Sequence, residues 1–499
     1  MRRYWVIIVS VFWILIFGII KFAPTDAELL LRYASVSKFS AINLPANFAG
    51  ELPFPIPTAV LSLFTNHIPV NIFLFRLPNL IISLLNLGIT GILFSTGAML
   101  IFSGSLWLFW ISMSDFSAAV TLLLVMLILA VDKNIGNSKH KFYWFGFLNL
   151  WLSMTSFAGW IFVIIFIFWK LKERDWKTTG MVILIAAYAY FNAVNIYFVS
   201  EKTDLGSMVD QRVRYETTIT NYKEPVPLFI KRFVYNKPYF WYRKKIIEIG
   251  SYFSLEKMAF PGQEDATVSR NLWGSKSLPW IYFWQIPLVV YAITRIKIHK
   301  NIVILGGWGL LSLILGNKGD WLANSIGIPL TMAVIMGDFI NQSNQRIRMA
   351  VWVMFIISVI PSFYHFVNHE QVWRDNRPLV HQTMAQMALR HEGTTISTIL
   401  GRSFLYYGWI KQIEPEMFWR GFEVGMKIDG VKFDHFEKPI HKGVYVGLPG
   451  EFIGNKSDKR SNEFSAIELP GNMKLLEEAK TKDTVSFGNG DYIWTVQVN

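Results

Sequence analysis

The chain has 499 residues, a formal net charge of +13 and no cysteine. The lack of cysteine excludes disulfide bonds, thiol catalysis and zinc sites built from thiolates. Hydrophobic residues make up 52% of the chain and charged residues only 17%, and the apolar residues form runs long enough to cross a bilayer as helices. Many lysines and arginines lie in short loops beside these runs and no nucleic-acid-binding module is present, so we expect no nucleic-acid partner.

The first apolar run, residues 4–20, follows two arginines. It is longer than the core of a cleaved signal peptide, and the residues after it form a poor cleavage site. We therefore predict a first transmembrane helix that enters from the cytoplasm. The next apolar runs cover residues 72–94, 96–113 and 116–131. Four crossings return the chain to the cytoplasm, where the basic loop 132–141 satisfies the positive-inside rule.

The apolar run 142–169 is too long for one span, and the basic segment 170–174 follows it. Two short helices that turn near residues 156–159 keep this segment in the cytoplasm, and we prefer that interpretation. Residues 181–199 then lead out to a long outer loop at 200–277. The remaining spans are expected at residues 278–294, 302–315, 321–340 and 349–366, which gives about eleven transmembrane helices in total.

The first outer loop, residues 22–71, opens with the signal for a helix start. Thr25 or Asp26 is expected to cap the helix, and Glu28 lies in its first turn, where a negative charge is favourable. The helix is amphipathic, and we predict that it lies along the membrane surface. In the long outer loop, Arg243 and Lys244 stand among aromatic residues. That pattern suits anchoring at the membrane interface, and it also suits sugar stacking or pyrophosphate binding.

Residues 369–499 have the composition of a soluble domain. Residues 380–388 are expected to be helical and 444–447, 485–487 and 492–496 to be strands, with a tight turn at 488–491. The histidines of this part show no metal-ligand spacing, so no metal site is predicted. The fold class is therefore mainly α: a polytopic transmembrane domain at residues 1–368, followed by a small extracytoplasmic α/β or mostly β module at 369–499.

Several short strings occur in an order that resembles a known family. They are Phe75-Arg76-Leu77-Pro78-Asn79 at the start of the second span, residues 105–107 and 117–120 around the third and fourth, and residues 236–237, 250–254, 259–262 and 270–274 in the long outer loop. Together with the order of spans and outer loops over residues 1–440, they resemble the GT-C superfamily of membrane glycosyltransferases. The most similar branch contains protein O-mannosyltransferases and aminoarabinose transferases.

This resemblance implies transfer of a sugar from a polyprenyl-phosphate carrier to an acceptor glycan, lipid or protein outside the cytoplasmic membrane. Such a reaction needs a carboxylate that activates the acceptor hydroxyl or holds a divalent cation, cationic groups for the leaving phosphate, and a groove for the prenyl chain. The implied location is the inner membrane, with a cytoplasmic N-terminus and contacts with membrane lipids. The sugar, the acceptor, metal dependence and the oligomeric state stay open.

Roles come from the family's pattern residue by residue. Asp26 is the expected acceptor-facing base, and Asp115, between the third and fourth spans, is the expected second acidic residue; either could instead cap a helix. Arg76 is expected to face the carrier phosphate or to reach toward lipid headgroups. The residues expected to bind substrate are Glu28, Arg76, Arg243, Lys244 and Arg270.

One departure from the family's pattern keeps two other functions open. The family commonly has an Asp-Glu pair just after the first span, whereas this chain has Thr25-Asp26 with Glu28 two residues later. A catalytically degenerate relative that serves as a scaffold in envelope glycan assembly is therefore one alternative. A transporter or flippase is another, although the two halves of the chain show no internal repeat.

Overall fold

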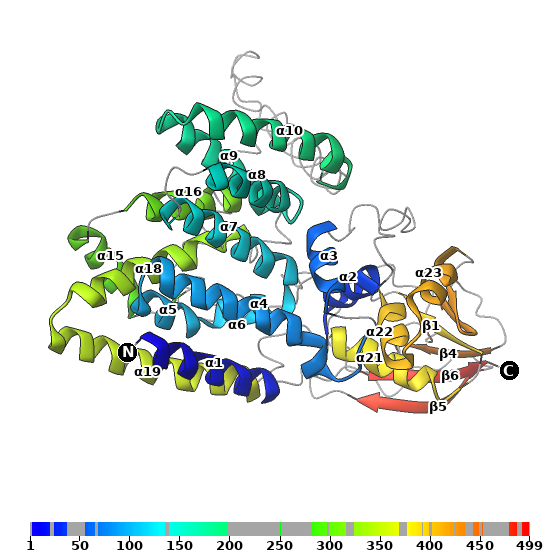
Figure 1. The fold of residues 1–499 in the computed structure, drawn as a ribbon. Helices are drawn as coiled ribbons and strands as arrows, with labels where there is room; N and C mark the ends of the chain where they lie inside the picture. The colour runs from blue at the N-terminus through cyan, green and yellow to red at the C-terminus, as the bar shows by residue number, and fades with distance from the viewer. Residues whose placement is uncertain are drawn as a thin grey trace, which may run out of the picture.

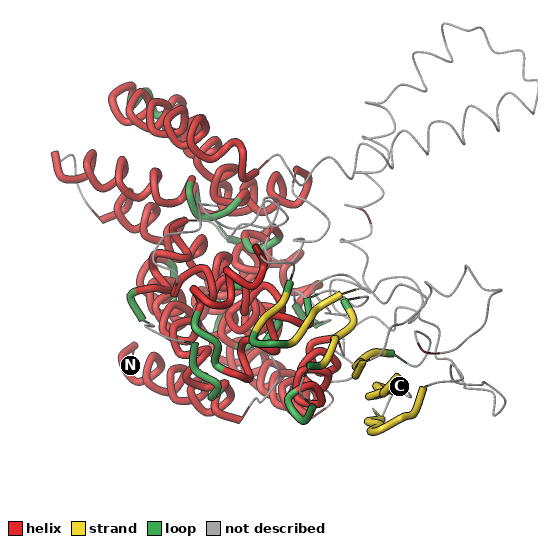
Figure 2. Tube along the Cα trace, turned by 90° about the vertical axis from the view of Figure 1, so that its right-hand side faces the viewer, coloured by secondary structure: helices red, strands yellow, loops and turns green. Residues whose placement is uncertain are grey.

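The computed structural model has a helical part and a part built around a β-sheet, and the strands lie together at one end of the helical part (Figures 1 and 2). Three predicted site residues, Arg243, Lys244 and Arg270, and the predicted turn 488–491 lie outside the described residues. The structure describes residues 2–19, 24–36, 55–64, 68–134, 139–197, 250, 281–282, 284–296, 299–315, 324–368, 377–391, 393–398, 402–423, 426–434, 443–448, 452, 479–486 and 492–498.

The helical part carries most of the apolar runs. Figure 1 shows α1 and α19 side by side along one edge, where the rings of Phe12 and Phe363 are 5.4 Å apart between centroids. The helices are α1 (Arg2–Ile19), α2 (Asp26–Val36), α3 (Pro55–Ser62), α4 (Ile72–Leu93), α5 (Thr96–Ser103), α6 (Leu106–Ser114), α7 (Phe116–Asn134), α8 (Lys139–Ser153), α9 (Phe157–Lys172), α10 (Trp176–Tyr197), α15 (Gln285–Arg295), α16 (Lys300–Leu315), α18 (Gly327–Gln342) and α19 (Gln345–Asn368).

Three helices in the described part of the chain, α4, α7 and α19, are long and apolar enough to cross a membrane, and the bent pair α5 and α6 could form a fourth span. The chain is therefore an integral membrane protein. The expected total of about eleven spans stays a prediction. The interpretation of residues 142–169 as two helices is confirmed by α8 and α9. Their break lies slightly before the predicted turn, and Ser156 caps α9 by accepting a hydrogen bond from the Gly159 N–H at 3.0 Å.

Residues 96–113, predicted as one span, form two helices, α5 and α6, that meet at an angle of 70°. Ser105 begins a new helix by accepting a hydrogen bond from the Leu108 N–H. The two carbonyls at the break find donors on other elements. Trp13 Nε1 donates to Ser103 O at 3.1 Å and the Tyr282 hydroxyl donates to Gly104 O at 2.8 Å. Protein donors thus replace the helical hydrogen bonds that a bilayer could not supply.

Helix α18 packs tightly between α5 and α16 through pairs of glycines. Gly337 lies against Gly97 of α5, and Gly327 lies against Gly309 of α16, with no room for a Cβ atom at either contact. Close backbone approach through small residues is the usual way in which membrane helices gain van der Waals contact. The centre of the bundle is therefore fixed by backbone-to-backbone packing.

The C-terminal part contains one mixed sheet of six strands in the order β2-β3-β1-β4-β6-β5. Strand β1 pairs in parallel with β3 and β4, and the other pairs are antiparallel. The predicted helix and the strands predicted at 444–447 and 492–496 match α21, β4 and β6, the strand predicted at 485–487 overlaps only the end of β5, and the other elements were not predicted. The elements are α21 (Arg377–Ala388), β1 (Thr394–Ser397), α22 (Ser403–Lys411), α23 (Pro415–Glu423), β2 (Lys427–Ile428), β3 (Val431–Asp434), β4 (Gly443–Gly447), β5 (Ala479–Ser486) and β6 (Tyr492–Val498).

The apolar face of helix α2 packs against protein, whereas the sequence predicted that this face meets the membrane surface. Leu29, Leu30 and Tyr33 belong to the same hydrophobic core as the C-terminal helices and strands. The Tyr33 ring stacks on Phe418 of α23, with centroids 4.0 Å apart and planes 13° apart. The apolar face that suggested lipid contact is therefore buried against protein, and α2 is enclosed between the two parts of the molecule (Figure 1).

Candidate functional site

The N-terminal turn of α2 is held by a reciprocal pair of hydrogen bonds. The Glu28 N–H donates to Thr25 Oγ1 at 3.3 Å, and the Thr25 N–H donates to Glu28 Oε2 at 2.6 Å. This is a capping box, in which two otherwise unpaired backbone donors are satisfied. Thr25 is therefore the cap, and Asp26 is the first helical residue.

Glu28 also forms a buried ion pair with Arg76 near the start of α4. Arg76 Nε lies 2.8 Å from Glu28 Oε1 and Arg76 Nη2 lies 3.1 Å from Glu28 Oε2, and both side chains are only 4% exposed. A two-pronged guanidinium–carboxylate contact is among the strongest in proteins. Removing one partner would leave a buried charge uncompensated, at a cost of about 3–5 kcal/mol. The pair therefore fixes α2 to α4.

A second buried guanidinium, that of Arg32, lies one turn further along α2. Its Nη2 donates to Phe75 O and, at 3.5 Å, to Asn79 Oδ1, and the guanidinium lies 4.8 Å above the Phe75 ring. Within the described residues Arg32 Nη1 has no hydrogen-bond partner. Burial lowers the pKa of Arg32 to about 9; the charge of Glu28 acts against this, and the charge of Arg76 adds to it. Arg32 is thus a desolvated cation without a carboxylate of its own among the described ion pairs.

The cluster continues from α4 to the junction of α6 and α7. Asn79 Nδ2 donates to Met113 O at 3.0 Å, in the last turn of α6. Asp115 follows this turn and caps α7, accepting a hydrogen bond from the Ala118 N–H at 2.9 Å on Oδ1. A helix cap is therefore part of its role, as the sequence allowed. The Ser117 N–H is a second backbone donor to this carboxyl.

Asp115 is the carboxyl group of this cluster with a perturbed acidity. Burial raises its pKa to about 6; the backbone N–H groups of Ala118 and Ser117 act against this, and the negative charge of Glu28 adds to it. Among the described ion pairs none includes Asp115. A carboxylate with a pKa near neutrality can accept a proton from a substrate hydroxyl and release it again. Asp115 and Glu28 are therefore electrostatically coupled across the cluster.

Asp26 points to a different neighbour, helix α22 of the C-terminal part. The Tyr406 hydroxyl lies 2.8 Å from Asp26 Oδ1 and 2.8 Å from Pro24 O, so its one proton is shared between two acceptors. Arg402, one turn earlier, is close enough for its charge to interact with Asp26. Burial lowers the pKa of Arg402, and Asp26 acts against that shift.

The structure thus brings together three of the seven residues predicted from the sequence: Glu28, Arg76 and Asp115. It places Asp26 on the neighbouring contact with α22, and the other three lie outside the described residues. Sequence reasoning missed Arg32 and Asn79. Arg32 follows Glu28 by four residues, which places both on one helix face, and that spacing could have indicated a shared role.

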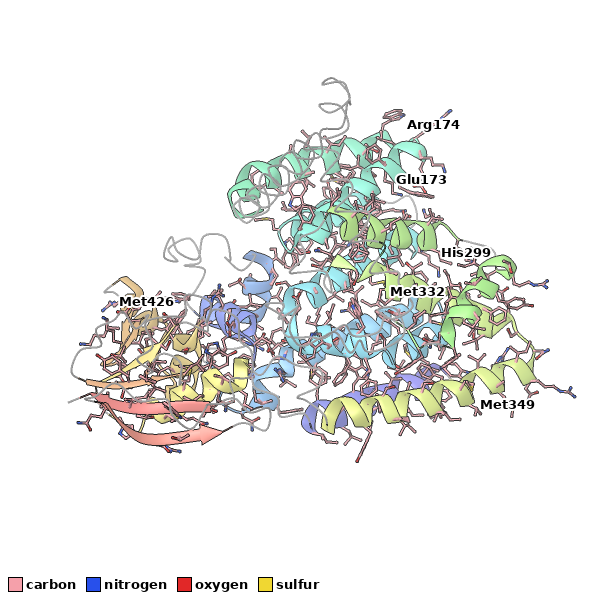
Figure 3. The ribbon with its side chains drawn as sticks, turned by 180° about the vertical axis from the view of Figure 1, so that it is seen from behind. Glu173, Arg174, His299, Met332, Met349 and Met426 are labelled. Atoms are coloured by element: carbon pink, nitrogen blue, oxygen red, sulfur yellow. The ribbon has the colours of Figure 1, made fainter. Side chains whose placement is uncertain are left out.

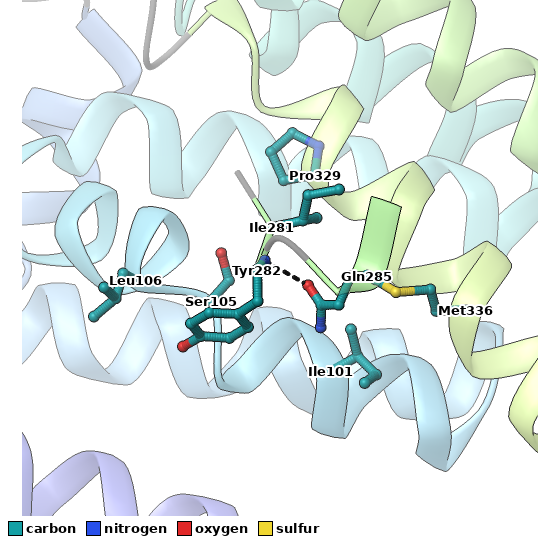
Figure 4. A pocket seen from close by; sticks show the side chains of 8 residues that line it. All are labelled: Ile101, Ser105, Leu106, Ile281, Tyr282, Gln285, Pro329 and Met336. Carbon is teal, nitrogen blue, oxygen red and sulfur yellow. Dashed lines mark hydrogen bonds between the residues drawn. The ribbon is translucent and has the colours of Figure 1, made fainter. Parts of the chain in front are cut away.

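A small cavity lies at the break between α5 and α6 (Figure 4). Within it, the Tyr282 N–H donates to Gln285 Oε1 at 2.9 Å. Helix α6 begins at Leu106 beside this cavity and ends next to Asp115, which is a rise of about 13 Å along the helix. The lining is mostly apolar and consists of Ile101, Ser105, Leu106, Ile281, Tyr282, Gln285, Pro329 and Met336.

A second charged cluster lies at the opposite end of α7. Asp132 is 4% exposed, and its oxygens lie 2.7 Å from Lys170 Nζ, 2.5 Å from Lys300 Nζ and 3.4 Å from Lys141 Nζ. Glu173 contacts the same Lys170 and Lys300 at 2.6 and 2.8 Å. Figure 3 shows Glu173 at the end of the helical part far from Met426 of the C-terminal part. Three basic loops that the sequence assigned to one side of the membrane thus meet at one place.

No group of three or more histidine, aspartate or glutamate side chains is arranged to hold a metal ion in the part of the chain that the structure describes. The arrangement of Glu28, Arg32, Arg76 and Asp115 can instead supply one titrating carboxylate and two desolvated cations at the end of the membrane helices. Such a set can move a proton and stabilise a developing negative charge.

No family model and no curated protein sequence matches the chain. A similar solved structure is the Archaeoglobus fulgidus oligosaccharyltransferase complex with Zn and sulfate, with 11% identity and a TM-score of 0.44, over 81% of this chain and 61% of that one. ArnT from Cupriavidus metallidurans bound to undecaprenyl phosphate has 12% identity and a TM-score of 0.38, over 85% and 76%. Its apo state has 9% identity and a TM-score of 0.35, over 85% and 71%.

This chain spans 61% of the length of the archaeal protein. At such low identities and TM-scores, the activity of this chain has to follow from its own residues.

Proposed function

We propose that the chain is a membrane glycosyltransferase that moves a sugar from a polyprenyl-phosphate carrier to an extracytoplasmic acceptor, which is a glycan, a lipid or a protein. The proposed setting is the inner membrane, with a cytoplasmic N-terminus and the C-terminal part outside. Asp115 is the proposed general base in place of Asp26, whose carboxylate accepts a hydrogen bond from the Tyr406 hydroxyl. Arg32 and Arg76 are the proposed cations for phosphate. Arg243, Lys244 and Arg270 remain proposed substrate contacts on the sequence resemblance alone.

The observation that carries this proposal is the environment of Asp115. Its carboxyl has a pKa of about 6 because of burial, close to the value at which a general base works best at neutral pH. Two buried guanidiniums lie in the same cluster, one of which has an unpaired Nη1 among the described residues. A structural ion pair needs matched charges, whereas a titrating carboxylate and a cation with an unpaired donor in one cluster suit a reaction that forms a phosphate anion.

The position of the cluster supports a lipid-linked donor. It lies at the ends of α4, α6 and α7, and the apolar cavity at the other end of α6 is about 13 Å away along that helix. In this proposal the carrier phosphate lies beside Arg32, at the end of α6 that carries Asp115. An apolar site with a few polar groups at one end is what an amphiphilic substrate needs.

The proposed reaction forms one glycosidic bond and breaks one sugar–phosphate ester bond. The acceptor oxygen attacks the anomeric carbon of the sugar, and its proton passes to the Asp115 carboxylate. The bond between the anomeric carbon and the phosphate oxygen breaks, and its electron pair leaves with the carrier phosphate. The guanidinium of Arg32 then offers a hydrogen bond to the new phosphate charge.

The test is incubation of the purified protein with radiolabelled polyprenyl-phosphate sugars and a set of envelope acceptors. Wild-type protein is expected to transfer label, and Asp115→Asn to lose at least about 100-fold of the rate, because general base catalysis contributes about that much or more. Asn can still cap α7, so the variant should fold. Transfer at an unchanged rate by Asp115→Asn would show that Asp115 is not the general base. Absence of transfer by the wild-type protein from every donor would contradict the proposed transferase activity.

One observation favours a second function, that of a non-catalytic scaffold. Glu28, the second acidic residue after the first span, is engaged by Arg76 and by its capping box. A scaffold would need this pair only for stability. Cells in which Asp115→Asn restores envelope glycosylation after deletion of the gene would favour the scaffold, and failure of the variant to restore it would favour the enzyme.

A further inference from the structure

Helix α2 has two functional sides that contact different parts of the molecule. On one side, Glu28 and Arg32 engage Arg76, Phe75 and Asn79 of α4. On the other side, Asp26 meets Tyr406 of α22. Because Asp26 and Glu28 are two residues apart on a helix, they point about 200° apart around its axis. A force on the Asp26 side therefore acts directly on the turn that carries Glu28.

We propose that Tyr406 is a positioning residue that holds the first turn of α2 in register with α4, so that the C-terminal part is a working component of the site rather than an appended domain. Its hydroxyl binds both Asp26 Oδ1 and Pro24 O, which are the residues on either side of the Thr25 cap. The hydroxyl thus ties together the chain segment that enters α2 and the first residue inside it. This inference rests on the proposed transferase only for its activity measurement.

The neighbouring tyrosine shows that this contact is specific to one hydroxyl. Tyr406 and Tyr407 are adjacent on α22, and both are buried. The Tyr406 ring stacks on His381 at 5.2 Å, and its hydroxyl reaches α2. The Tyr407 ring contacts Phe433 at 5.6 Å, within the C-terminal part. Removing the two hydroxyls in turn therefore separates a contact between the parts from packing within one part.

Close packing around the contact between Tyr406 and Asp26 fixes α22 against α2. Gly408 of α22 lies so close to the Tyr33 side chain that a Cβ atom there would overlap the Tyr33 hydroxyl. The Trp409 Nε1 donates to Pro69 O at 3.2 Å, in the segment that leads into α4. Helix α22 thus contacts both α2 and the entry to α4, which are the two elements that carry the Glu28–Arg76 pair.

The first experiment measures amide hydrogen exchange of the full-length protein in detergent. Tyr406→Phe is expected to speed exchange of the amides at residues 29–32 about tenfold, since a hydrogen bond to a charged group has about that effect on a local equilibrium. Tyr407→Phe is the matched control and should leave these amides unchanged. Unchanged exchange in Tyr406→Phe, or an equal increase across strands β1–β6, would overturn the proposal.

A double-mutant cycle protects the test against simple unfolding. Asp26→Ala, Tyr406→Phe and the double variant are compared by the labelling rate of one cysteine introduced at Ser35, which is 1% exposed. The chain has no cysteine, so this thiol is the only one labelled. If Asp26 and Tyr406 act through the same hydrogen bond, the double variant should be labelled no faster than the faster of the two single variants. If the increases in labelling rate of the two single variants multiply in the double variant, the two residues act independently, and the proposal is overturned.

An activity measurement separates positioning from mere stability. Glu28 raises the pKa of Asp115, so loosening α2 should shift the acid limb of the transfer rate to lower pH in Tyr406→Phe. Arg32 and Arg76 face the same cluster. Arg32 lies on α2 and would move with it, whereas Arg76 stays on α4. If Tyr406→Phe lowers the transfer rate without shifting the acid limb of its pH profile, the positioning role is overturned. If no donor is turned over, the transferase proposal fails alone, because exchange and labelling still decide the role of Tyr406.

Discussion

Helix α7 carries an aspartate at each end, and the two sites differ in how the charge is compensated. Asp115 at its start and Asp132 near its end are separated by about 26 Å along the helix. Asp132 lies among Lys141, Lys170 and Lys300. Asp115 has a helix cap and the nearby charge of Glu28, with no ion pair among the described residues. The same residue type is thus neutralised at one end and destabilised as an anion at the other.

This difference separates a structural cluster from a reactive one. Around Asp132, every described carboxylate oxygen faces a lysine, and the contacts tie α7, α8, α9 and α16 together. Around Asp115, burial raises the pKa of the carboxyl to about 6, and Arg32 keeps an unused donor among the described residues. Folding alone favours the first arrangement, because an uncompensated buried charge is costly. The second arrangement suits a site that a ligand completes.

The largest contrast is expected from the same substitution at the two ends of α7. Asp115→Asn should lower the transfer rate by about 100-fold to 10,000-fold while the protein stays folded, because it removes the proposed base. Asp132→Asn should lower stability and leave the rate per folded molecule unchanged. Transfer assays on equal amounts of folded protein, judged by gel filtration, measure this contrast. Equal rate losses in both variants would erase the distinction between the two clusters.

Breaking the cluster around Asp132 should have the largest effect on stability. Lys170→Met keeps the length of the side chain and leaves two carboxylates short of one cation, so we expect a loss of about 3 kcal/mol. Lys411→Met removes one partner of the exposed pair with Asp429, where both side chains are more than 40% exposed, and should cost less than about 1 kcal/mol. Thermal unfolding in detergent measures both. Similar shifts in the two variants would contradict the structural role.

The raised pKa of Asp115 predicts a dependence of stability on pH. The folded carboxyl titrates at about 6 and the unfolded one at about 3.9, so the folded state binds more protons between these values. Its contribution to stability is therefore full below about pH 4 and is lost as pH rises to about 6. Asp115→Asn should be more stable than wild type at pH 7 by on the order of 2 kcal/mol and equal to it at pH 4. A difference that does not change with pH would contradict the shift.

The smallest effect is expected at Glu173, on the rim of the cluster around Asp132. Burial raises the pKa of its carboxyl, but hydrogen bonds from Lys170, Lys300 and Trp169 outweigh this and lower the pKa overall. Its contribution is therefore present at neutral pH and is lost as pH falls below about 4.5. Because the side chain is one-third exposed, Glu173→Gln should cost less than about 1 kcal/mol. A loss as large as that of Lys170→Met would place Glu173 at the centre of the cluster.

Much of the architecture was accessible from the sequence because it depends on local patterns. The length of apolar runs located α4, α7 and α19, and the basic segment after residue 169 required the turn between α8 and α9. The spacing of Thr25 and Glu28 marked a helix start that the capping box accounts for. The sequence also pointed to Glu28, Arg76 and Asp115 as site residues. Their roles in a reaction stay predictions.

Other features depend on contacts between residues far apart in the chain. The break at Gly104 exists because Trp13 and Tyr282, from other elements, satisfy its carbonyls. The apolar face of α2 could equally have met lipid, and its burial is decided by Tyr33, Phe418 and α22. Arg32 and Asn79 join the cluster only once α2 lies across α4. No local pattern carries this information, because an apolar face specifies burial and not the partner.

The amino-acid sequence by itself determined that this chain is embedded in a membrane, where several of its helices begin, and which charged residues stand at the ends of its spans. Those properties follow from hydrophobic length, capping and charge, which act over a few residues. Only the tertiary structure decided which charges are compensated. Whether Asp115 or Asp132 meets a lysine depends on helices that are distant in sequence, and that pairing sets the acidity of each carboxyl.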